Sequence, residues 1–213
     1  MSGATSRWLL VRHGRAAAPR PGAYAGWSDV PLDTGAVPGL RRLAAGLAAQ
    51  PLALAYSSDL ERARDTAALL LEGREPGPPL RLDADLRELH FGAWEGSTYA
   101  EIAARPGGPA VLAGTGAPPG GESLADLAAR TGRFLERLRR ETPDASAGAV
   151  LIVAHGGPLR LLLCHLLGLP PEAHWRFRVD HGSVSEVHWN AATGPVLCAL
   201  NRGHRLPPGE ACR

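Results

Sequence analysis

Two segments of the sequence place a histidine and a glycine directly after an apolar run. The first is Arg12-His13-Gly14, which follows the run at 8–11, and the second is His155-Gly156, which follows the run at 150–154. Four or more apolar residues that end at a glycine turn are typical of buried strands. Open α/β sheets bind ligands at the carboxyl ends of their strands, and an arginine there suits a phosphate or a carboxylate. Both segments are therefore candidates for an anion site.

The elements that must position these histidines follow from the hydrophobic periodicity. Apolar runs predict strands at 8–11, 52–56, 80–86 (weakly), 149–154, 184–189 and 195–200. Helical spacing predicts helices at 40–49, 58–71, 97–104, from 123 onward and from about 158 to 168. Strands that alternate with helices favour an α/β fold with a largely parallel sheet.

Several boundaries carry their own signals. Ser58 and Glu61 have the spacing of a capping box, which predicts Ser58 as the N-cap of the 58–71 helix. Pro38 is expected to delay the start of the 40–49 helix. The segments at 16–38 and 107–121 are rich in Gly, Pro and Ala, so we expect a loop over the strand edge and a loop or lid.

A further arginine joins the two histidines. Arg62 lies in the first turn of the predicted 58–71 helix, and helical side chains lean toward the N-terminus of their helix. Arg62 is therefore expected to point back at the strand end that precedes it. Arg12, His13, Arg62 and His155 then meet at three strand ends.

Five segments, in this order, resemble the histidine phosphatase superfamily, also called phosphoglycerate mutase-like. They are Leu10-Val11-Arg12-His13-Gly14, the run at 56–67, the run at 86–96, Pro119-Gly120-Gly121-Glu122-Ser123 and the run at 153–160. The resemblance implies a three-layer α/β/α sandwich with a mostly parallel central sheet. It also implies a single domain over residues 1–213, in which the loop at 16–38 and the segment at about 88–121 form lid or cap insertions.

The resemblance further implies a phosphomonoester as substrate and a role for each site residue. Arg12 and Arg62 would hold the phosphate through forked donors. His13 would attack phosphorus as a neutral imidazole and form a phosphohistidine. His155 would stabilise charge on the phosphoryl group, with Gly156 beside it in the phosphate pocket.

In the same scheme, Glu88 would protonate the leaving oxygen and later activate water. Glu95, Glu101 and Glu122 are nearby alternatives for this acid. Positioning and electrostatics suffice for such a transfer, so no metal and no cofactor are expected. Among the other histidines, His181 is the best further candidate, because it precedes a glycine near the expected edge of the site.

Three functions remain open within this resemblance. The runs at 91–96 and 120–123 are similar to the phosphatase branch, which includes alpha-ribazole phosphatase and broad-specificity phosphatases. Alpha-ribazole phosphate is the named substrate we expect. A cofactor-dependent phosphoglycerate mutase is less favoured, because residues 15–19 lack the polar groups of the mutase pattern. A phosphate-binding protein without catalysis is the third alternative.

Composition sets limits on the partners. The chain has 213 residues, a formal net charge of +2 and 3 cysteines, Cys164, Cys198 and Cys212, without a CxxC pair. These features predict neither a disulfide framework nor a zinc cluster, and they give no sign of a nucleic-acid or membrane partner. We expect a cytoplasmic monomer or homodimer that acts on a small molecule.

Overall fold

A mixed sheet of six strands forms the centre of the molecule, in a computed structural model that describes residues 5–17, 20–142 and 147–203. The strands are β1 (Ser6–Arg12), β2 (Leu52–Ser57), β3 (Leu80–Leu82), β4 (Ala149–Ala154), β5 (Val184–Asn190) and β6 (Gly194–Arg202). Their order is β3-β2-β4-β1-β5-β6. The first four pair in parallel, and β5 and β6 add antiparallel strands at one edge. The predicted α/β class with a mostly parallel sheet is confirmed.

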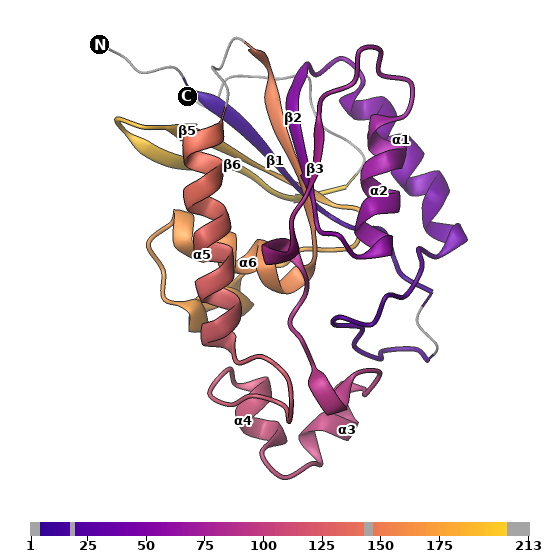
Figure 1. Ribbon diagram of the computed structural model, residues 1–213, viewed down its shortest axis with the longest axis vertical. Coiled ribbons are helices and arrows are strands. Elements are labelled where there is room, and N and C mark those ends of the chain that lie inside the picture. The colour runs from indigo at the N-terminus through magenta and orange to yellow at the C-terminus, as the bar shows by residue number, and fades with distance from the viewer. Residues whose placement is uncertain (1–4, 18–19, 143–146, 204–213) are drawn as a thin grey trace.

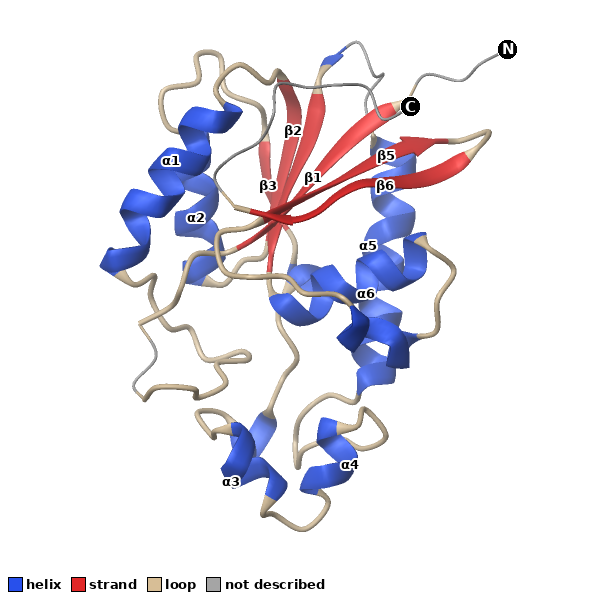
Figure 2. Cartoon of the chain, turned by 180° about the vertical axis from the view of Figure 1, so that it is seen from behind, coloured by secondary structure: helices blue, strands red, loops and turns tan. Residues whose placement is uncertain are grey.

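Helices cover both faces of this sheet, as Figures 1 and 2 show from opposite sides. On one face lie α1 (Val37–Leu47) and α2 (Glu61–Leu71), and on the other lie α5 (Leu124–Glu141) and α6 (Gly156–Leu166). Alternate residues of β1 serve the two layers: Trp8 and Leu10 join the core beneath α5 and α6, whereas Leu9 and Val11 join the core beneath α1 and α2. This alternation anchors β1 in both cores. The carboxyl end of β1 lies where the parallel strands end.

The segment between β3 and α5 leaves the sandwich. It contains the short helices α3 (Tyr99–Ala103) and α4 (Gly108–Leu112), which form a small lobe at the bottom of the view in Figure 1. Phe91, Trp94 and Ile102 are the buried centre of this lobe. The chain then returns to α5, whose capping box joins Ser123 and Asp126.

Three predicted boundaries are wrong. The helix expected at 40–49 begins at Val37, because Pro38 falls in its first turn, where its missing N–H costs nothing. The segment expected as a loop at 107–121 contains α4. Ser58 does not cap α2, whose N-cap is Leu60 without a side-chain bond. The Ser58 hydroxyl accepts the backbone N–H of Leu60 at 3.3 Å and also binds a histidine, as described below.

No helix in the described ranges is long and apolar enough to span a bilayer. Those same ranges hold no group of three or more His, Cys, Asp and Glu side chains arranged to hold a metal ion. Cys212 lies outside them, and of the other cysteines Cys164 is buried in α6, as its apolar neighbours predict.

Candidate active site

The carboxyl ends of three neighbouring strands meet at one point. The backbone N–H of His13 donates to Ala154 O at 2.9 Å, and that of Ser58 donates to Val153 O at 2.9 Å, so the ends of β1, β2 and β4 are locked side by side. The rings of His13 and His155 lie 4.7 Å apart, centroid to centroid. The two histidine-glycine segments of the sequence therefore form one site.

A cavity of about 470 Å³ opens at these strand ends. Four of the predicted residues line it: Arg12, His13, Arg62 and Glu88. His155 is fully buried behind His13 and does not line the cavity. Gly156 begins α6, and a Cβ at this position would lie 3.3 Å from Cζ of Arg12, so the glycine allows the guanidinium to approach the helix.

His13 is held as a neutral imidazole with one nitrogen free. Its Nδ1 lies 2.5 Å from Gly14 O. A carbonyl oxygen only accepts hydrogen bonds, so Nδ1 carries the proton and Nε2 keeps its lone pair. Burial lowers the pKa of His13 well below its ordinary value, and electrostatic interactions with His181, Arg62 and Arg12 lower it further. This is the protonation state that a nucleophilic histidine needs.

His155 is oriented by the serine that was expected to cap α2. Its Nε2 lies 2.8 Å from Oγ of Ser58, and burial lowers the pKa of His155 well below the usual range. Its Nδ1 is buried without a hydrogen-bond partner in the described structure, and so is Nε of Arg12. The third such atom, Nε1 of Trp8, belongs to the core under α5 and α6. Unpaired buried polar atoms are rare, and two beside one cavity favour a polar ligand there.

Arg62 ties the loop at 20–33 to the cavity. Its guanidinium donates to the carbonyls of Ala25, Gly26 and Ser28 at 2.7–2.9 Å. Glu95 binds the same loop. Its carboxylate accepts hydrogen bonds from the backbone N–H groups of residues 26, 27 and 28 at 2.9–3.2 Å. Glu95 is thereby committed to structure rather than to the cavity.

Glu88 approaches the first turn of α6. Its Oε1 accepts the backbone N–H of Leu89 at 2.9 Å and that of Gly157 at 3.0 Å. The positive end of a helix favours a carboxyl group at this place. A Cβ at position 157 would lie 2.2 Å from Oε1, so only glycine lets the carboxyl group approach. Gly157, the second glycine of the His155 segment, was not among the predicted site residues.

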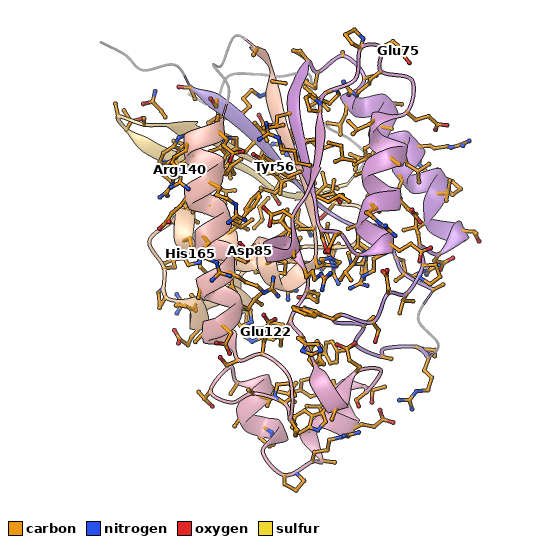
Figure 3. The ribbon with its side chains drawn as sticks, in the orientation of Figure 1. Tyr56, Glu75, Asp85, Glu122, Arg140 and His165 are labelled. Carbon is orange, nitrogen blue, oxygen red and sulfur yellow. The ribbon has the colours of Figure 1, made fainter. Side chains whose placement is uncertain are left out.

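A largely buried ion pair near the N-terminus of α5 positions the backbone that carries Glu88. Arg130 is 5% exposed and forms a bidentate pair with Glu122 at 2.9 Å. Its guanidinium also donates to the carbonyls of Asp85, Arg87 and Glu88. Figure 3 shows Glu122 at the lower end of α5 and Asp85 farther up beside the same helix. Glu122 is thus occupied, and Glu101 pairs with Arg20 on the surface, so Glu88 is the glutamate that lines the cavity.

Comparison with known proteins decides the family. Residues 8–201 match the Histidine phosphatase superfamily (branch 1).

This chain belongs to the histidine phosphatase superfamily.

Relatives within the superfamily have different activities. The chain is 36% identical over 180 residues to 2,3-bisphosphoglycerate-dependent phosphoglycerate mutase 2 of Gloeobacter violaceus, covering 81% of each chain. It is 34% identical over 187 residues to adenosylcobalamin/alpha-ribazole phosphatase of Salmonella typhimurium, covering 85% of this chain and 89% of the relative. The solved structure of a mycobacterial glucosyl-3-phosphoglycerate phosphatase with VO3 superposes with a TM-score of 0.81 at 32% identity, over 93% of this chain and 100% of the other. The protein is accordingly a phosphatase of this superfamily, whose substrates are phosphomonoesters.

His181 is the additional histidine of this phosphatase site. It lines the cavity, and its ring lies 5.0 Å from that of His13. Its Nδ1 lies 3.3 Å from the carbonyl of His13. Partial burial of the ring and the charge of Arg12 lower the pKa of His181 to about 4, so it adds a neutral wall beside His13.

The neutral histidines make the stability of the phosphatase depend on pH. The pKa values of His13, His155 and His174 are all lowered, chiefly by burial. Below about pH 6.5 these histidines bind protons in the unfolded chain, whereas in the folded chain they stay neutral. The free energy of unfolding should therefore be highest above this pH and fall as the pH drops, by up to about 1.4 kcal/mol per pH unit for each such histidine.

Urea unfolding in phosphate-free buffer between about pH 7.5 and about pH 5.5 measures this effect. Carboxylates with lowered pKa values, such as Glu95, titrate below this window. A His13→Asn variant should lose part of the slope, because one of the titrating groups is gone. A free energy of unfolding that does not change with pH would contradict the prediction.

Proposed function

We propose that the protein hydrolyses a small-molecule phosphomonoester, without a metal, through a phosphohistidine at Nε2 of His13. The observation that carries this proposal is the hydrogen bond from Nδ1 of His13 to Gly14 O, which leaves Nε2 with its lone pair in a cavity whose lining includes Arg12 and Arg62. These two arginines offset the charge of the phosphate before the imidazole approaches. The proposal also assigns His155 and Gly156 to the phosphate pocket because their segment resembles the family, although neither residue lines the cavity in the structure.

In the first step, Nε2 of His13 forms a bond to phosphorus while the bond from phosphorus to the ester oxygen breaks. The proton that the leaving oxygen needs comes from the carboxyl group of Glu88. In the second step, a water molecule gives its proton to the Glu88 carboxylate and attacks phosphorus. The phosphorus–nitrogen bond breaks, and His13 and inorganic phosphate are regenerated.

The substrate is proposed from the relatives. Alpha-ribazole phosphate is our named substrate, since the Salmonella relative is described as an alpha-ribazole phosphatase and the runs at 91–96 and 120–123 resemble that branch. Phosphoglycerate mutase is the second candidate, because a relative of that description shares 36% identity. The absence of polar side chains at Ala16 and Ala17, which both line the cavity, weighs against it.

The test is phosphate release from a panel of esters in the presence of a chelator. The panel contains p-nitrophenyl phosphate, alpha-ribazole phosphate, phosphoserine and 3-phosphoglycerate. Hydrolysis that persists with the chelator, fastest for alpha-ribazole phosphate, is the expected result. Conversion of 3-phosphoglycerate with its bisphosphate primer, in place of hydrolysis, would establish the mutase. Inactivity in both assays, with phosphate still bound, would favour the non-catalytic alternative.

A further inference from the structure

A second, mostly apolar cleft adjoins the phosphate cavity. It holds about 100 Å³ and is lined by residues of α5 and α6 on one side and of the small-lobe helix α4 on the other. Tyr24, Glu88 and Phe91 line both spaces, so the two lie side by side at these residues. Leucines of α5 and residues of α4 form its apolar walls.

The residues that line the two spaces indicate which part of a substrate would occupy the cleft. In a phosphoryl transfer the attacking and leaving atoms lie roughly in line on opposite sides of phosphorus. His13 lines the cavity and not the cleft, whereas Glu88 and Gly157 line the cleft. The leaving ester oxygen would lie close to Glu88, on the side of phosphorus opposite His13. The rest of the alcohol would then extend into the cleft.

The cleft contains one cation that the protein leaves unneutralised. Arg160 lines it from α6, and its Nε donates to Phe177 O at 3.1 Å. Its guanidinium lies 5.0 Å from the ring of Trp175, which is 55% exposed at the cleft. Throughout the described ranges no carboxylate forms an ion pair with Arg160. The arginines on the outer side of the phosphate cavity are different, since Arg15 pairs with Asp33 and Arg20 pairs with Glu101.

We propose that this cleft binds the leaving group of the substrate, and that it selects an alcohol with a flat apolar or aromatic body that bears an anionic or strongly hydrogen-bond-accepting group for Arg160. The inference rests on the proposed phosphatase function and specifies its substrate class. The ring packs against Trp175 and the leucine walls, because an aromatic face suits both surfaces. The acceptor takes the free N–H groups of the guanidinium, whose planar fork matches a carboxylate.

The experiment compares phenyl phosphate with 2-, 3- and 4-carboxyphenyl phosphate, so that the carboxylate samples different directions from one ring. The native enzyme should prefer at least one carboxylated isomer in kcat/KM. Arg160→Met keeps the length of the side chain and removes the charge. In this variant the ratio of kcat/KM between that isomer and phenyl phosphate should fall about tenfold or more, the range for loss of a hydrogen bond to a charged group.

Arg176→Met is the matched control, because it removes an exposed arginine beside Trp175 that does not line the cleft. It should leave the ratio unchanged. An equal loss for all esters in Arg160→Met, with weaker inhibition by inorganic phosphate, would overturn the proposal and assign Arg160 to the phosphate pocket. An unchanged ratio, or a native enzyme without preference for any carboxylated isomer, would also overturn it.

A binding measurement separates this inference from the proposed function. Calorimetric titration of the preferred isomer into His13→Ala, with and without Arg160→Met, reports the cleft without turnover. About tenfold weaker binding in the double variant supports the cleft even if the hydrolytic mechanism is wrong. Equal binding of the isomer to both variants overturns the cleft while leaving phosphate release by the native enzyme as the separate test of function.

Discussion

Replacement of His13 by alanine should reduce phosphate release by at least about 10⁴-fold with every ester, the scale seen when a nucleophile is removed from an enzyme. The reason is that the proposed nucleophile, Nε2 of His13, has its lone pair in the cavity that Arg12 and Arg62 also line. Inorganic phosphate should still bind, because the arginines remain. The measurement is steady-state hydrolysis of p-nitrophenyl phosphate, paired with calorimetric binding of phosphate.

His165→Ala is the matched control for this variant. His165 is on α6, as Figure 3 shows, and its Nε2 lies 2.9 Å from the carbonyl of Ala128, away from the cavity. The control should keep nearly native activity and a native circular dichroism spectrum. Rapid quenching of the native enzyme with a labelled ester should trap a phosphoryl group on the protein, and His13→Ala should trap none. Turnover near the native rate in His13→Ala would exclude the phosphohistidine mechanism.

The residues that could be predicted from the sequence are those whose position follows from local periodicity. His13 and His155 directly follow apolar runs that predict two strands, and the structure shows these strands to be parallel neighbours. Arg62 follows from helix geometry, since its place in the first turn directs the side chain to the strand ends. The buried stripe of α5, from Leu124 to Leu138, follows from helical spacing.

Ser58 shows where local rules fail. Its spacing to Glu61 fits a capping box, yet its hydroxyl lies on Nε2 of His155. An unsatisfied helix N–H near solvent is hydrated at little cost, whereas a fully buried imidazole nitrogen without a partner costs about 1–3 kcal/mol. The contact with His155 is therefore favoured over a cap on α2. Only the folded structure brings Ser58 and His155 together.

Arg130 and Glu95 could not be predicted for a related reason. Each is a charged residue whose partners are backbone groups of distant segments: Arg130 binds carbonyls near Glu88, and Glu95 binds N–H groups of the loop near Arg62. The loop itself has no periodicity, so its path is set by these contacts. One signal was present, because Arg130 follows Leu127 by three residues and falls on the buried stripe of α5.

Replacement of Glu88 by glutamine should reduce hydrolysis in proportion to the need of the leaving group for a proton. Alkoxide leaving groups need protonation and nitrophenolate does not, so kcat/KM for an alkyl phosphate should fall about 10²–10⁴-fold and that for p-nitrophenyl phosphate far less. The ratio kcat/KM reports phosphoryl transfer to His13 and excludes the later attack of water. Since Glu88 also activates that water, kcat should fall toward one common low value for both esters.

Two further variants locate this effect at the carboxyl group. Glu136→Gln changes an exposed glutamate of α5 and should alter neither ester. Gly157→Ala keeps the carboxyl group but places a Cβ where Oε1 lies, and it should reproduce the dependence on leaving group in a milder form. If Glu88→Gln lowered kcat/KM equally for alkyl and nitrophenyl esters, Glu88 would act by holding the pocket together rather than by donating a proton, and the acid would have to be sought elsewhere along the cavity.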